Sequence, residues 1–350
     1  MAKEKMQTES SGALRKRFIE PPFSVIDTKT GLWKERKQKW LEFGIKSEVG
    51  RDVESLIGQN DTDYMPDMKS GTSIFDPALC ELLYTWFCPI GGVILDPFAG
   101  GSVRGIVAHK MGYKYTGIEL RQEQVNANVQ QGKELIPDNQ PIWICGDSNQ
   151  EVTKLEDKFD FIFSCPPYAD LEVYSNDKAD LSNKSYPEFI QLYESIISKS
   201  IDKLKEGHLA VFVVGDVRDK EGYYYDFVSD TKKAFIKCGA KLYNDAILLD
   251  PIGTAMIRAN VAMSSKKLVK FHQNILCFKK VGKMPDTLKK RIQIDYIENN
   301  ICPVGYPKDG YDSRRDCEIC PIRDTHRINK DSGNCELIKI PISENQQPLM

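Results

Sequence analysis

The sequence predicts an α/β fold in which helices cover both faces of a mostly parallel sheet. Between residues 93 and 216, short apolar runs alternate with longer segments whose apolar residues recur at helical spacing. Strands that alternate with helices form parallel crossover units, which build a doubly wound sheet. Several of the apolar runs also end in an acidic residue or a Gly-rich turn, and ligands of such sheets bind at the carboxyl ends of the strands.

Length and composition limit the classes of protein that the chain can form. The chain has 350 residues, enough for one large domain with appendages or for two domains. Its formal net charge is −2, so a nucleic-acid partner would have to bind local basic patches. The first residues have mixed charge, and no apolar run reaches the roughly 18 residues of a membrane span. Ten cysteines without a secretory signal indicate a reducing compartment, so we expect a cytoplasmic protein without membrane contact.

The order of motifs and composition divides the chain into five parts. They are an N-terminal segment 1–51, a linker 52–71, a main domain 72–282, a Cys-rich lobe 283–340 and a tail 341–350 that we expect to be disordered. The N-terminal segment interleaves basic residues with Trp33 and Trp40. Its cations and rings could bind a nucleic-acid backbone, or the two tryptophans, seven residues apart, could dock a helix on the protein.

The main domain supplies all elements of the predicted sheet. Strands are expected at 93–96, 115–120, 141–147, 159–165, 208–216, 242–249 and 274–280, and helices at 72–87, 103–111, 121–135, 186–205 and 225–238. The last two strands would close the sheet as a hairpin-like pair. The basic stretch between them, with Arg258, Lys266, Lys267 and Lys270, is expected to be a loop on the substrate side.

A Gly-rich turn follows the first predicted strand. Residues 96–102 read Asp-Pro-Phe-Ala-Gly-Gly-Ser, and glycines let the backbone approach a ligand because no Cβ intervenes. The turn lacks the G-x-G-x-x-G spacing of a dinucleotide site and the Lys-Ser/Thr of a P-loop. It resembles motif I (D-P-F-x-G-x-G) of the S-adenosylmethionine (SAM)-dependent DNA amino-methyltransferases, which implies that Asp96, Phe98, Gly100 and Gly101 bind SAM. Ser102 replaces the third glycine and could cap the next helix.

Acidic residues end the second and third predicted strands. Glu119 follows the second strand, where a carboxylate can accept both ribose hydroxyls of a nucleoside ligand. Asp147 follows the third, where an acid can accept from the adenine amino group. Their order and spacing match residues that the resembled family uses in these roles, so both are expected to bind SAM.

A second motif ends the fourth predicted strand, at Ser164, Cys165, Pro166, Pro167 and Tyr168. It resembles motif IV of the amino-methyltransferases, in which Asp, Asn or Ser precedes Pro-Pro and an aromatic residue. In that family the ring stacks on a flipped-out base, and the first side chain and the first proline carbonyl align the exocyclic amine with the methyl group.

Cys165 departs from that pattern because a thiol is a weak hydrogen-bond acceptor. Either the Pro166 carbonyl performs most of the alignment with help from Ser164, or Cys165 acts as a nucleophile, as in carbon-5 cytosine methylation. A third interpretation is a buried cysteine at a strand end with no chemical role.

Together the motifs make residues 72–280 similar to the amino-methyltransferase domain of bacterial and phage enzymes. The resemblance implies a Rossmann-like class I methyltransferase fold with a seven-stranded sheet. It also implies a DNA methyltransferase that transfers the methyl group of SAM to N6 of adenine or N4 of cytosine, as in restriction-modification. An RNA substrate and a non-catalytic DNA-binding protein of the same fold stay open as alternatives.

The C-terminal lobe contains a C-x-x-C pair, Cys317 and Cys320, between the single cysteines Cys302 and Cys335. Four thiolates could form a closed tetrahedral site for structural zinc. Free thiols in a small lobe are the alternative.

Overall fold

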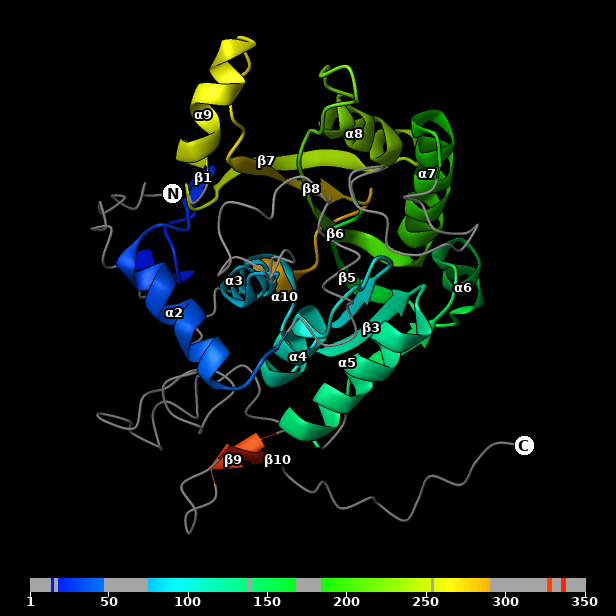
Figure 1. Cartoon of the computed structure of the whole chain (residues 1–350). Helices are drawn as coiled ribbons and strands as arrows, with labels where there is room; N and C mark the ends of the chain where they lie inside the picture. Colours follow the sequence, from blue (N-terminus) through cyan, green and yellow to red (C-terminus); the bar gives the residue numbers. More distant parts are fainter. Residues whose placement is uncertain are drawn as a thin grey trace, which may run out of the picture. The chain divides into compact units, whose positions relative to one another are not determined.

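An eight-stranded sheet forms the centre of the protein, in the order β1–β7–β8–β6–β5–β2–β3–β4 (Figure 1). The computed structural model describes residues 14–15, 18–46, 75–137, 140–167, 184–252, 255–289, 326–328 and 335–337. The strands are β1 (Val25–Asp27), β2 (Val93–Asp96), β3 (Lys114–Glu119), β4 (Ile142–Cys145), β5 (Phe159–Ser164), β6 (Leu204–Val214), β7 (Lys241–Leu249) and β8 (His272–Lys279). In this sheet β8 is antiparallel to β6 and β7, and the other pairs are parallel.

The predicted mostly parallel sheet, closed by a hairpin-like pair, is therefore confirmed for strands β2 to β8. The prediction of seven strands was one short, because β1 comes from the N-terminal segment and pairs with β7 in parallel. A three-residue strand of this kind is too short to show a period-2 pattern in the sequence. The described part of the N-terminal segment thus shares the sheet of the main domain.

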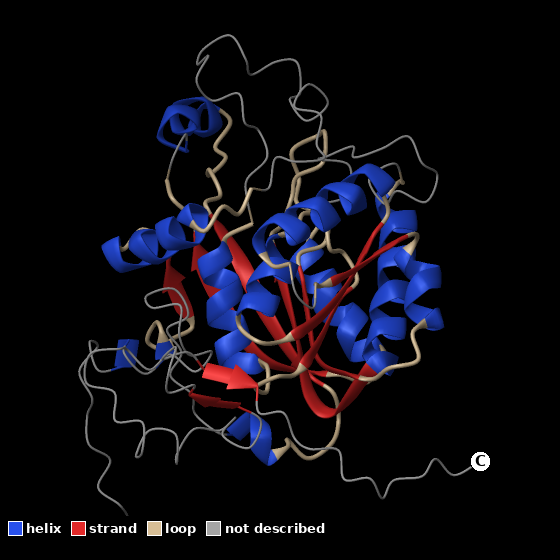
Figure 2. Ribbon diagram, turned by 90° about the horizontal axis from the view of Figure 1, so that it is seen from below, coloured by secondary structure: helices blue, strands red, loops and turns tan. Residues whose placement is uncertain are grey.

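Helices cover both faces of the sheet (Figure 2). They are α2 (Gly31–Glu42), α3 (Pro77–Phe87), α4 (Val103–Lys110), α5 (Gln122–Leu135), α6 (Ser148–Lys154), α7 (Tyr186–Lys203), α8 (Phe227–Lys237), α9 (Ala255–Ser264) and α10 (Asp286–Lys289). On one face, Tyr84 of α3 packs edge-on against Phe161 and Phe163 of β5. On the other, α6, α7 and α8 contribute to the main apolar core.

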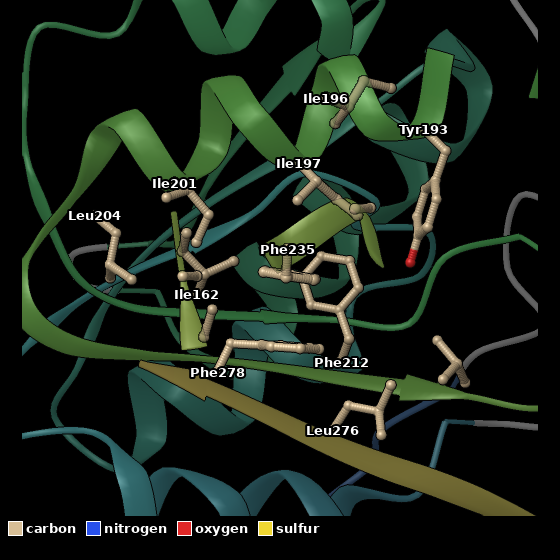
Figure 3. Packing of buried hydrophobic residues seen from close by; sticks show 14 of the residues in the cluster. Ile162, Tyr193, Ile196, Ile197, Ile201, Leu204, Phe212, Phe235, Leu276 and Phe278 are labelled. Carbon is tan, nitrogen blue, oxygen red and sulfur yellow. The ribbon is translucent and has the colours of Figure 1, made fainter. Parts of the chain in front are cut away.

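That core joins α7 and α8 to β6 and β8 (Figure 3). Phe235 of α8 stacks on Phe278 of β8 with ring centroids 3.9 Å apart, and its ring also meets Phe212 of β6 at 4.9 Å. All three side chains are buried. Truncation of a buried phenylalanine typically costs about 3–5 kcal/mol, so each of these three rings is expected to contribute strongly to the stability of the protein.

The N-terminal helix α2 is docked, as one of the two interpretations of Trp33 and Trp40 predicted. Both tryptophans are buried, at 2% and 1% exposure, and their indole N–H groups donate to Asp76 and Glu81 at 3.0 Å. Glu81 is completely buried and also accepts from Arg36 at 2.5 Å. The two rings are therefore inside the protein, and the interpretation in which they stack on nucleic acid was wrong. Contact between the basic residues of this segment and a nucleic-acid backbone stays a prediction.

Two helices differ from the predictions. The stretch between β7 and β8, expected to be a loop, contains helix α9. Helix α6 was not predicted, because its seven residues are mostly polar and give no apolar period. Asp147 caps it, accepting the backbone N–H of Asn149 at 2.8 Å.

The chain divides into two compact units, Met1–Arg291 and Ile292–Met350. In the second unit the structure describes β9 (His326–Ile328) and β10 (Cys335–Leu337), which pair antiparallel. Among all described residues, no helix is both long enough and apolar enough to span a membrane.

Candidate functional site

The carboxyl ends of the parallel strands bring the predicted site residues to one edge of the sheet. In space, Asp147 follows β4, Glu119 ends β3, the Gly-rich turn follows β2 and Cys165 follows β5. Neighbouring strands lie about 4.8 Å apart, so the ends of β4 and β5 are separated by about 14 Å across three gaps. An extended ligand with a nucleoside at one end and a reactive group at the other fits such a row.

Side chains from three helices hold the carbonyl groups of the Gly-rich turn. Arg104 of α4 donates to the carbonyls of Phe98 and Ala99 at 2.6 and 2.8 Å. Asn128 of α5 donates to the carbonyl of Gly100 at 2.8 Å, and Ser148 of α6 to that of Pro97 at 2.5 Å. Four successive carbonyls of the turn are thus fixed, which organises its backbone before any ligand arrives.

Asp96 lies at the centre of a buried polar network instead of at the protein surface. Its side chain has no exposure to solvent. One carboxylate oxygen accepts from the Phe98 N–H at 3.1 Å and from the Ser164 hydroxyl at 2.5 Å. The other accepts from Arg104 Nε at 2.5 Å and from the Tyr115 hydroxyl at 2.8 Å. Four protein donors occupy the carboxylate, so we expect its effect on cofactor binding to be indirect, through the turn.

Arg104 is the buried cation that compensates the charge of Asp96. Burial, the largest single effect, would lower the pKa of Arg104. The charges of Asp96, Tyr115 and Cys165 and the hydrogen bond with Asp96 together outweigh burial, so the pKa is raised. Its guanidinium also lies 4.7 Å from the ring centroid of Phe75, a cation–π distance. Arg104 therefore stays charged and contacts Asp96, the Gly-rich turn and Phe75, which precedes α3.

Tyr115 reaches Asp96 because two glycines leave room for its ring. A Cβ on Gly117 would lie 2.7 Å from Tyr115 Cε1, and a Cβ on Gly105 would lie 3.1 Å from the same ring. Burial first, and then the charge of Asp96, raise the pKa of Tyr115 well above its ordinary value. Its hydroxyl therefore stays protonated and remains a donor to Asp96.

The other residues of the turn have distinct places. The Phe98 ring packs into the core, 5.8 Å from Tyr193 and 6.3 Å from Phe212 by ring centroids. Gly100 has a left-handed backbone with φ of +53°, which a glycine adopts without strain, and Gly101 is partly exposed. The two glycines are thus the members of the motif that present backbone at the sheet edge.

Ser102 does not cap α4, contrary to expectation. It occupies the N-cap position but makes no side-chain capping hydrogen bond. Its hydroxyl instead donates to Gln131 of α5 at 2.6 Å, and the Gln131 amide also binds the backbone of Lys46. The serine links the turn to α5, a contact between distant segments that no local sequence pattern reveals.

Glu119 and Asp147 remain close to solvent at the end of the row. Glu119 accepts the backbone N–H of Arg121 at 3.0 Å, and its side chain is 13% exposed. Asp147 is partly exposed and serves as the cap of α6. β3 and β4 are adjacent, with Glu119 opposite Cys145, so the two carboxylates flank one end of the edge.

The described residues of the Pro-Pro motif at the end of β5 differ in their exposure to solvent. Ser164 is completely buried and donates to Asp96, whereas Cys165 and Pro167 are partly exposed and Pro166 is buried. The last four residues of β5 are buried on both faces of the sheet, so Ser164 lies inside the protein. Tyr168 lies outside the described residues. The hydrogen bond between Ser164 and Asp96 joins the Gly-rich turn to the Pro-Pro motif.

Sequence analysis missed Arg104, Tyr115, Asn128 and Ser148, which build the support of this site. A usable signal existed only for Arg104, a cation within the otherwise apolar start of a helix directly after the turn. For the other three, the contacts depend on side-chain packing between separate elements.

The predicted zinc site cannot be located in the structure. Cys302, Cys317 and Cys320 lie outside the described residues, and of Cys335 only its place in β10 is described. In the part of the chain that is described, no cluster of three or more His, Cys, Asp or Glu side chains could hold a metal ion.

Comparison with solved structures finds SAM-dependent methyltransferases. TrmN from Thermus thermophilus matches at 13% identity over 59% of this chain and 49% of its own length, with a TM-score of 0.41. Magnesium protoporphyrin IX methyltransferase (ChlM) from Synechocystis PCC 6803 matches at 12% identity over 69% of this chain and 93% of its own, with a TM-score of 0.40. This chain thus spans about half the length of TrmN.

No protein-family model and no curated protein matches the chain. The class of fold is nevertheless defined by the chain's own topology: a Rossmann-like sheet with helices on both faces and an antiparallel strand inserted beside β6. At such low identities and TM-scores the structural matches add no argument about chemistry, which depends on the residues of the sheet edge.

Proposed function

We propose that the chain is a SAM-dependent DNA methyltransferase that acts on an exocyclic amine of a flipped-out base, N6 of adenine or N4 of cytosine. The observation that carries the proposal is the 2.5 Å hydrogen bond between Ser164 and Asp96. It connects a turn resembling motif I with a Pro-Pro motif resembling motif IV, at the sheet edge where ligands of this fold class bind.

In this proposal, one group of residues binds SAM and another aligns the target amine. Glu119 would accept the ribose hydroxyls, Asp147 the adenine amino group, and the backbone at Gly100 and Gly101 would lie along the ligand. Bound SAM supplies an electrophilic methyl group. The Pro166 carbonyl would accept a hydrogen bond from the target amine and direct its lone pair, with Tyr168 stacked on the base, so that acceleration comes mainly from positioning.

Ser164 has a different role in this proposal from the one suggested by sequence. Its hydroxyl donates a hydrogen bond to the buried Asp96, so it supports the strand end and does not align the amine. Alignment then falls to Pro166, while Cys165 lies at the partly exposed position between them.

Carbon-5 cytosine methylation by Cys165 is the second candidate. One observation favours it: Cys165 interacts electrostatically with the buried cation Arg104, and reactive cysteines typically have a cation nearby. The guanidinium is already engaged by Asp96 and two carbonyls, which limits this effect.

Nucleoside mass spectrometry on DNA from cells that express the chain tests the proposal. N6-methyladenine or N4-methylcytosine should appear, vanish with Tyr168→Ala, and persist with Lys114→Ala at the opposite edge of the sheet. 5-Methylcytosine would favour the second candidate. Without any methylated base in DNA, but with methylated RNA, the substrate class would be wrong.

A further inference from the structure

Helix α9 stands away from the sheet beyond the end of β7 in both views (Figures 1 and 2). Ala255, at its start, is buried at 6% exposure. The following residues 256–261 are all exposed. Met256, Ile257 and Val261 are 74%, 62% and 75% exposed, which is unusual for side chains of this size. A helix of this kind is suited to burial against a partner.

The exposed face of α9 combines apolar side chains with an amide. At 100° per residue, one half of the helix carries four apolar residues and two polar ones, with Arg258 at its margin. In angular order these are Met263, Met256, Asn260, Ser264, Ile257 and Val261. The small residues Ala255, Ala259 and Ala262 form the opposite side. Asn260 thus lies near the middle of a mostly apolar surface, beside Ser264, whose hydroxyl donates to the Val261 carbonyl at 2.7 Å. Burial of the Asn260 amide in lipid or in a protein interface without a hydrogen-bonding partner would be costly.

The charged residues of the segment that carries α9 are all positive. Residues 251–271 contain Arg258, Lys266, Lys267 and Lys270 and no acidic residue. Lys270 interacts with Asp216 at 3.5 Å. Arg258 and Lys266 are exposed, and neither has an ion-pair partner among the residues that the structure describes. A second copy of the chain about a twofold axis would bring these cations together, whereas a polyanion would neutralise them.

The position of α9 relates it to the proposed site. Both β6 and β7 are antiparallel to β8, so β7 runs in the direction of β6 and β5. The chain therefore leaves β7 at Leu249 on the same edge of the sheet where Cys165 and Pro166 follow β5. A partner bound to α9 would lie on the side from which the site is reached.

We infer that α9 enters the major groove of duplex DNA and reads base edges there, an inference that rests on the proposed function. The major groove is about 12 Å wide and admits one α-helix. Asn260 would bind the adenine edge, and the neighbouring apolar side chains would contact thymine methyl groups. Arg258 and Lys266 would contact phosphates on the two sides of the groove.

The test measures the salt dependence of binding to a fluorescent 30-base-pair duplex by anisotropy. Each lost phosphate contact reduces the slope of log K against log salt by about 0.9, so Arg258→Ala with Lys266→Asn should reduce it by about 1.8. Asparagine is chosen because Lys266 has a left-handed φ of 57°, which asparagine tolerates. The control, Lys114→Ala with Lys241→Ala, removes the same charge from the opposite edge and should keep the slope.

The outcomes separate this inference from the proposed function. Equal slopes for both double variants, with wild-type duplex binding and DNA methylation intact, would overturn the role of α9 alone. Absence of wild-type duplex binding would overturn both. Two further results would overturn the inference in favour of another partner: a dimer in sedimentation that Ile257→Ser with Val261→Ser dissociates, or tighter binding to phosphatidylserine vesicles than to DNA.

Discussion

Replacement of Arg104 by methionine should be the most damaging single change at the site. Methionine keeps most of the volume but leaves the Asp96 carboxylate buried without its cation, at no solvent exposure. It also removes the two hydrogen bonds to the carbonyls of Phe98 and Ala99. The expected results are lower stability and a disordered Gly-rich turn.

The magnitude follows from the contacts that remain. Breaking a buried ion pair by removing one partner typically costs about 3–5 kcal/mol. Asp96 keeps three donors, from Phe98, Tyr115 and Ser164, which places the cost near the lower end, at about 3 kcal/mol. Domains of this kind are stable by only about 5–15 kcal/mol, so the loss is large but leaves a protein that can be measured.

Urea denaturation followed by circular dichroism gives the free energy of unfolding. The matched control is Lys237→Met, which breaks the pair with Glu194 at 2.7 Å, where the lysine side chain is 73% exposed. This exposed pair should contribute about 1 kcal/mol or less. A loss of under 1 kcal/mol for Arg104→Met, or one equal to the control, would refute the reasoning about the buried network.

Three other predictions concern chemistry, pH and metal. Cys165→Ser should keep or raise amine methylation if alignment is the role of this position, whereas complete loss would support a nucleophile. Hydrogen bonds from His208, Lys205 and the Val93 N–H outweigh burial and lower the pKa of Asp160 below its ordinary value. This carboxylate therefore stabilises the folded state above about pH 4, and that stabilisation is lost as the pH falls further. The free energy of unfolding, measured by urea titration, should fall less between about pH 5 and about pH 3 in Asp160→Asn than in the wild type. Zinc should co-purify at about one equivalent, and its absence by elemental analysis would reject the four-cysteine site.

The sequence predicted the sheet well because several strands contain apolar runs with clear ends. The apolar run of β6 covers residues 209–214, β5 is apolar at four of its six positions, and Asp96 and Glu119 are the last residues of β2 and β3. Strand β1 was not predicted because three residues are too few to show a periodic pattern. Helix α9 was not predicted because its apolar side chains are exposed to solvent and the basic residues around it suggested a loop.

The sequence predicted where the residues of the candidate site lie along the sheet, but it did not predict which of them are buried. The motifs placed Glu119, Asp147 and the Pro-Pro turn at one edge, since the carboxyl ends of parallel strands meet there. They could not show that Asp96 and Ser164 are buried and hydrogen-bonded to each other. A sequence motif does not distinguish a residue that contacts the ligand from one that holds other residues of the site in place. That distinction depends on Arg104 and Tyr115, which approach Asp96 from α4 and β3.

Calorimetric titration with S-adenosylhomocysteine tests most directly whether this sheet edge is a SAM site. The wild-type chain should bind one equivalent, and Glu119→Gln should weaken binding about 10- to 100-fold, because a hydrogen bond to a charged acceptor is worth about 1.5–3 kcal/mol. Glu123→Gln, on the neighbouring helix with a side chain 62% exposed, should leave the affinity unchanged. No binding by the wild-type chain, or equal losses in both variants, would contradict the assignment.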